Sequence, residues 1–225
     1  MTGPDLLQNW SKPSPSVSTE GGTVFVNPLH AGRTVLVARV GDAEGSLGAA
    51  AALACAGARL DQASLLVTVG GRQPRPALLA SAAAQKLEER LGSHLPELKP
   101  AARGQVCQLA VPAEEGGLAA AAAAATVARE AAVVVHLPPE LVQKSLEGDA
   151  PLAPAAMLLR ADLPLDRPLA ALAASDLIRR GLAVAVLKRR LGWVVERRAL
   201  FGALPAGAPG GLPERVVRRL LPEPR

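Results

Sequence analysis

Short, uniformly apolar runs alternate with segments of helical character along most of the chain. The apolar runs cover residues 23–26, 34–40, 64–69, 105–111, 132–137, 155–159 and 182–187, and the helical segments cover 46–59, 76–91, 114–130, 139–146 and 167–180. Strands that are apolar at nearly every position are typical of a parallel sheet buried on both faces. The sequence therefore predicts an α/β fold, with a mostly parallel sheet between helices on both faces.

A length of 225 residues suits one α/β domain with a full core. We predict three parts: a flexible tail and linker over 1–22, an α/β domain over 23–204, and a Pro/Gly loop with a short basic helix over 205–225. The tail is rich in Pro, Ser and Gly, which favours a linker. It also carries Leu6, Leu7 and Trp10 at helical spacing, which is one pattern of a docking peptide.

The composition limits both the core and the compartment. Apolar residues make up 49% of the chain, with two Phe, two Trp and no Tyr, so the core must be built from Ala, Leu and Val. The two cysteines, Cys55 and Cys107, are isolated in apolar contexts, which predicts buried thiols in a reducing compartment. The N-terminus lacks the pattern of a signal peptide, and the uncharged stretch 45–58 is shorter than the roughly 20 residues that span a bilayer. We therefore predict a cytoplasmic protein.

A glycine-punctuated loop follows the predicted strand 34–40 and leads into an alanine-rich helix. It reads Gly41-Asp-Ala-Glu-Gly-Ser-Leu-Gly48, so the candidate loop positions are Gly41, Asp42, Glu44, Gly45, Ser46, Leu47 and Gly48. Ligands of doubly wound folds bind at the carboxyl ends of strands, with phosphate at a helix N-terminus. A working phosphate loop needs a Lys and a Ser or Thr at its end. Here Ser46 and Leu47 follow Gly45, and two carboxylates stand where an anion would bind.

The same loop resembles the deviant Walker A motif of the MinD/ParA-type ATPases, which reads Lys-Gly-Gly-Val-Gly-Lys-Thr-Thr and precedes an alanine-rich helix. On this resemblance Gly41 takes the place of the signature Lys, Ser46 that of the P-loop Lys, and Leu47 that of the Mg²⁺-binding hydroxyl.

Two further segments are similar to the same family. Residues 132–139, Ala-Val-Val-Val-His-Leu-Pro-Pro, resemble the strand that ends in Asp-x-Pro-Pro, with His136 in place of the Asp. Residues 181–190 resemble the strand that ends in Asn-Arg, with Lys188 in place of the Asn. The resemblance covers about residues 33–190 and implies a P-loop NTPase-like three-layer sandwich. Because each decisive position differs, it implies a relative without ATP hydrolysis or a bound cofactor.

A second resemblance is to the glycine-rich loop of short-chain dehydrogenases, carried by Gly41, Gly45 and Gly48. Those enzymes use a Tyr-x-x-x-Lys pair, with the Tyr as acid and base. The absence of tyrosine from this chain excludes that chemistry.

Other candidate residues stand at predicted strand ends. Arg72 and Arg75 follow the strand 64–69 and precede a predicted helix, an arrangement that can hold an anion. His136 is the histidine at a predicted strand end, and an enzyme centred on it and the two arginines is one alternative. Asp166, before Arg167 and a proline, suits a helix start. No His, Cys and carboxylate cluster has the spacing of metal ligands, so we predict no metal site.

Charge is concentrated in the C-terminal third. From Arg160 onward there are 13 Lys and Arg against 6 Asp and Glu, and Lys188, Arg189 and Arg190 form one basic run. Such a surface suits an acidic protein, an acidic lipid surface or nucleic acid. The near absence of aromatic residues disfavours single-stranded nucleic acid.

Together these patterns predict a non-catalytic adaptor that binds a protein partner, as a homodimer or heterodimer, in a localisation, division or secretion machine. In the family that the chain resembles, ATP controls dimerisation and partner docking, so loss of the nucleotide implies constitutive docking. Two alternatives remain: an enzyme that binds a nucleotide or another small molecule at the strand-end loops, and a basic accessory factor for nucleic acid.

Overall fold

The computed structural model describes residues 34–41, 46–61, 63–71, 80–146, 152, 154–161, 163–188, 198–199, 202–203, 217 and 220–221. The predicted tail 1–22 and the predicted strand 23–26 lie outside the described residues. The same holds for Asp42, Glu44, Gly45, Arg72, Arg75, Arg189 and Arg190 among the candidate site residues.

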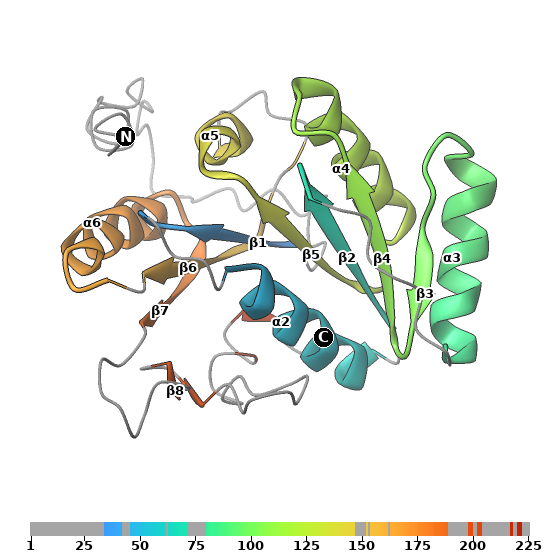
Figure 1. Ribbon diagram of the computed structural model, residues 1–225, viewed down its shortest axis with the longest axis horizontal. Coiled ribbons are helices and arrows are strands. Elements are labelled where there is room, and N and C mark those ends of the chain that lie inside the picture. The colour runs from blue at the N-terminus through green and yellow to red at the C-terminus, as the bar shows by residue number, and fades with distance from the viewer. Residues whose placement is uncertain are drawn as a thin grey trace, which may run out of the picture.

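Seven strands form one sheet in the order β3-β4-β2-β5-β1-β6-β7 (Figure 1). They are β1 (Thr34–Arg39), β2 (Ser64–Val69), β3 (Ala101–Arg103), β4 (Val106–Val111), β5 (Ala132–Leu137), β6 (Ala156–Ala161) and β7 (Ala183–Lys188). β3 runs antiparallel to β4, and the other neighbours are parallel. A separate antiparallel pair joins β8 (Arg198–Ala199) to β9 (Gly202–Ala203). The predicted α/β fold with a mostly parallel sheet is confirmed.

Helices cover both faces of the sheet. They are α2 (Ser46–Asp61), α3 (Ala82–His94), α4 (Glu115–Val127), α5 (Pro139–Val142) and α6 (Asp166–Arg179), with a 3₁₀ turn at Lys144–Leu146. Alanine dominates α2 and α4, and its high helix propensity and small side chain favour close packing on the sheet. Within the described residues, no helix has the length and apolar character that a membrane crossing requires.

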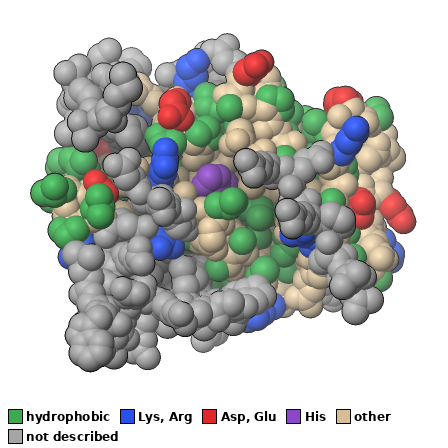
Figure 2. Space-filling view, viewed as in Figure 1, with side chains coloured by type: hydrophobic (Ala, Val, Ile, Leu, Met, Phe, Trp, Pro, Cys, Tyr) green, Lys and Arg blue, Asp and Glu red, His purple; other side chains and the backbone are tan. Residues whose placement is uncertain are grey.

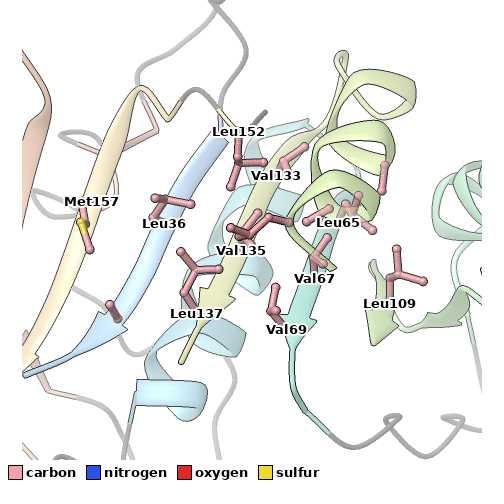
Figure 3. Packing of buried hydrophobic residues seen from close by; sticks show 14 of the residues in the cluster. Leu36, Leu65, Val67, Val69, Leu109, Val133, Val135, Leu137, Leu152 and Met157 are labelled. Carbon is pink, nitrogen blue, oxygen red and sulfur yellow. The ribbon is translucent and has the colours of Figure 1, made fainter. Parts of the chain in front are cut away.

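Alternate side chains of each strand enter two separate cores. The first core packs Leu36, Val67, Val135 and their neighbours against α3, α4, α5 and α6, and Figure 3 shows these side chains on one side of adjacent strands. The second core packs Val35, Val37, Val134 and Leu158 against α2, together with Val217, Leu220 and Leu221 near the C-terminus. Because both faces are covered, the strands are apolar at most positions, as the sequence indicated.

The structure differs from the sequence predictions at several places, and the predicted helix 139–146 is a short helix, α5, followed by a 3₁₀ turn. Helix α3 begins at Ala82 and not near residue 76, because Ala80 forms a β-bridge with Gly104 and the Ser81 hydroxyl caps the helix by accepting from the Ala84 amide. The sequence analysis missed β3, which has three residues. Helix α6 begins at Asp166, one residue before the prediction.

Both cysteines are free thiols. Cys107 is buried in β4, and burial, followed by the nearby Glu88 carboxylate, raises the pKa of its thiol to about 12. Cys55 is only half-buried, and burial raises the pKa of its thiol as well. The prediction of two buried thiols is thus confirmed in full for Cys107 and in part for Cys55.

Candidate functional site at the carboxyl edge of the sheet

The chain leaves two neighbouring strands, β1 and β5, in opposite directions. After β1 it passes through α2 to β2, which lies on the far side of β5, and after β5 it passes through α5 to β6, which lies on the far side of β1. The helices of these two connections cover opposite faces of the sheet. Such a reversal opens a crevice at the carboxyl ends of the strands, which is where open α/β folds bind ligands. The candidate site is therefore the edge formed by the ends of β1, β5 and β6.

Ser46 and His136 meet at this edge. The Ser46 Oγ lies 2.9 Å from the His136 Nε2, although the two residues are 90 positions apart in the sequence. Ser46 is the first residue of α2 and is 4% exposed. His136 stands in register with Val37 of β1 and Thr68 of β2. Strand alternation places it on the same face as Val134, which is the face that α2 covers.

The imidazole of His136 is held in its neutral form. Its burial, followed by the positive charge of Arg39, lowers the pKa of His136 below the ordinary value of 6.5. A neutral imidazole either accepts the hydroxyl proton of Ser46 or donates its own, according to its tautomer. The bond therefore joins the start of α2 to β5 without placing a positive charge at the helix N-terminus.

A serine beside a neutral histidine is part of the arrangement that nucleophilic catalysis requires. The third member of such an arrangement holds the other ring nitrogen, and no described residue hydrogen-bonds the Nδ1 of His136. The Ser46 side chain is also almost completely buried. The hydrogen bond links the start of α2 to the end of β5.

Gly41 and Asp166 form the next part of the edge. Gly41 has φ +64°, and a Cβ built on it would collide with the carboxylate of Asp166. Asp166 is 8% exposed, and its Oδ2 has no hydrogen-bond partner among the described residues. It begins α6, as its position before a proline suggested, but its side chain makes no capping hydrogen bond. A side chain at position 41 would have to displace this carboxylate.

Two arginines that the sequence analysis did not single out stand at the same edge. Arg39 of β1 and Arg160 of β6 are in register, and alternation places both on the face that α2 covers. Figure 2 shows a histidine near the middle of the face viewed, with Lys or Arg side chains beside it. The available signal was a basic residue at the end of an apolar run, at the edge that carries the glycine loop.

The remaining predicted residues are placed as follows. Leu47 is 46% exposed in the first turn of α2, and the backbone of Gly48 faces open space. Lys188 ends the edge strand β7, opposite Ala161 of β6. No group of three or more His, Cys, Asp and Glu that could hold a metal ion occurs among the described residues. The structure thus brings together Ser46 and His136, which the sequence analysis named separately. Whether His136 lies near Arg72 and Arg75 stays a prediction, since both arginines lie outside the described residues.

Comparison with known proteins gives no relative. No family model, no curated protein and no solved structure matches this chain.

Proposed function

We propose that this chain is a non-catalytic adaptor, a degenerate relative of MinD/ParA-like ATPases that binds a protein partner without nucleotide control. One observation carries the proposal: the N-terminus of α2, where a P-loop protein holds phosphate, is joined to β5 by the Ser46–His136 hydrogen bond. The hydroxyl and the neutral imidazole satisfy each other there, and neither supplies positive charge.

The identity of the two residues supports the proposal. The resemblance assigns Ser46 to the place of the P-loop Lys and His136 to the place of the strand-end Asp. These two replaced positions lie in hydrogen-bond contact. Leu47, in place of the Mg²⁺-binding hydroxyl, is a half-exposed aliphatic side chain that cannot ligate a metal. The P-loop amine and the Mg²⁺-binding hydroxyl are thus both lost. Their loss favours a role in which the fold serves as a scaffold for a protein partner in the cytoplasm.

Calorimetry tests the proposal. Titration of the full chain with Mg-ATP, ADP and NAD should give no saturable heat. Ser46→Lys alone should not restore binding, since Leu47 still offers no hydroxyl to Mg²⁺, and circular dichroism would verify that this variant is folded. Saturable binding of Mg-ATP to the natural chain would refute the proposal.

A small-anion site is the second candidate function, and Arg39 and Arg160 are the observation that favours it. Two guanidinium groups on adjacent strands, close to the start of a 16-residue helix, are a suitable setting for a carboxylate or phosphate. Inorganic phosphate belongs in the same calorimetric series. Saturable phosphate binding that is lost in both Arg39→Gln and Arg160→Gln would favour this candidate over the adaptor.

A further inference from the structure

The outer surface of α6 and the turn before it is unusually apolar. The large hydrophobic side chains exposed among the described residues are Leu47, Leu163, Leu165, Leu172 and Ile178. Of these, Leu163, Leu165 and Leu172 belong to this surface, whereas Ile178 lies about 120° around the helix from Leu172. Leu165 is 84% exposed and Leu172 is 64% exposed. Hydrophobic side chains gather at the left of Figure 2, over the place that α6 occupies in Figure 1. We name Leu163, Leu165 and Leu172 the α6 ridge.

The α6 ridge is not needed to hold the helix on the sheet. Packing uses the opposite side of α6, through Ala170, Ala173, Ala174 and Leu177. Leu165 and Leu172 are seven residues apart, so they lie on one stripe about two turns in length. A gathering of apolar side chains on a surface helix marks an interaction site more often than single exposed leucines do.

The charges around the α6 ridge indicate the kind of partner. Arg179 and Arg180 are exposed at the C-terminal end of the helix. The described carboxylates of α6 are hidden or engaged, because Asp166 is buried and Asp176 is 2.9 Å from the Arg180 guanidinium. Among the described residues Arg179 makes no ion pair. The surface is therefore an apolar stripe with a cationic end.

From this charge pattern we infer that the α6 ridge docks an amphipathic helix of a protein partner, with leucine-type residues facing the ridge and acidic residues flanking them. Helix-in-groove recognition uses apolar anchors at positions i, i+3 or i+4, and i+7, which match a stripe of this length. A second copy of the chain is a poor occupant, because it would bring the same cationic end without an unengaged carboxylate to meet it. The inference rests on the proposed function, since it names the surface through which the adaptor binds.

Two synthetic peptides test the inference by fluorescence anisotropy with the full chain. Both are helical peptides of about 18 residues with the same leucine stripe, and one carries Glu where the other carries Lys. The Glu peptide should bind, with an affinity that decreases as salt is added. The Lys peptide should not bind. The double change Leu165→Ser and Leu172→Ser should weaken binding at least tenfold, roughly the loss of a hot-spot contact. Leu47→Ser, on the helix covering the other face, should bind as the natural chain does.

Several results would overturn the inference: no binding of the Glu peptide, equal binding of both peptides, equal loss of binding in Leu47→Ser, or self-association in sedimentation experiments that the double change abolishes. Binding to vesicles of anionic lipid that depends on Leu165 and Leu172 would also overturn it, in favour of a membrane surface. Calorimetry separates this inference from the proposed function. If neither the Glu peptide nor Mg-ATP binds, only the inference about the α6 ridge is refuted. If Mg-ATP binds, the proposed adaptor function itself is refuted.

Discussion

At the scale of single residues, His136 has the most unusual environment at the carboxyl edge. It sits at the end of β5, hydrogen-bonded to Ser46 and close enough to Arg39 for the arginine to lower its pKa. A protonated imidazole there would lie in a buried setting next to a positive charge and a helix N-terminus, all of which disfavour it. In its neutral state His136 adds no positive charge to this edge.

This state predicts how stability depends on pH. The unfolded chain has a histidine of ordinary pKa, near 6.5, whereas the folded chain has one with a lowered pKa. The unfolded state therefore binds more protons as the pH falls, and the free energy of unfolding should decrease from about pH 7.5 toward pH 5. In His136→Gln, which keeps a polar group near Ser46, most of this decrease should be absent. Urea unfolding at several pH values would measure both chains, and parallel pH profiles would contradict the assignment.

At the scale of elements, α2 lies very close to β5. A Cβ built on Gly57 would be 2.7 Å from the Cβ of Ala132 and 3.1 Å from the Cδ1 of Leu221. Gly48 belongs to the same helix but has no heavy atom within 4 Å of a built Cβ. Within the same helix, a substitution at Gly48 therefore reports helix propensity alone, and a substitution at Gly57 also reports packing against β5.

Substitution of each glycine by alanine should change stability in opposite directions. Gly48→Ala should stabilise the chain by a few tenths to about 1 kcal/mol, the propensity gain of alanine over glycine. Gly57→Ala should destabilise it by about 1–3 kcal/mol, because overpacking outweighs that gain. Thermal and urea unfolding of both variants would measure the two effects. A stabilising Gly57→Ala would show that α2 does not rest this tightly on β5.

Much of the element layout could be predicted from the sequence, because strands buried on both faces leave a plain apolar pattern. The bounds of β2 and β5 are the ones predicted, and those of β1, β4, β6 and β7 differ by one or two residues. The start of α3 could not be predicted, since it depends on the bridge between Ala80 and Gly104, which are distant in sequence. The short β3 carries too few residues for a periodic signal.

At the scale of the whole molecule, the candidate site arises from strand order, which single segments do not encode. Ser46 and His136 were predicted separately, one as a loop position and one as a strand end, and only the adjacency of β1 and β5 brings them together. The register of β1 with β6 likewise places Arg39 beside Arg160. Ser46 and His136 could be singled out from the sequence, but their pairing, and the place of Arg39 and Arg160 beside them, required the sheet.

We propose that the fold keeps the position of a nucleotide site and that a neutral hydrogen bond occupies its phosphate-binding end. Nuclear magnetic resonance of the histidine ring nitrogens, titrated with pH with and without millimolar Mg-ATP, tests this claim most directly. We predict a neutral His136 with a pKa below 6.5 and ring signals that Mg-ATP leaves unchanged. A ring that is protonated at pH 7, or signals that move in a saturable way with Mg-ATP, would contradict it.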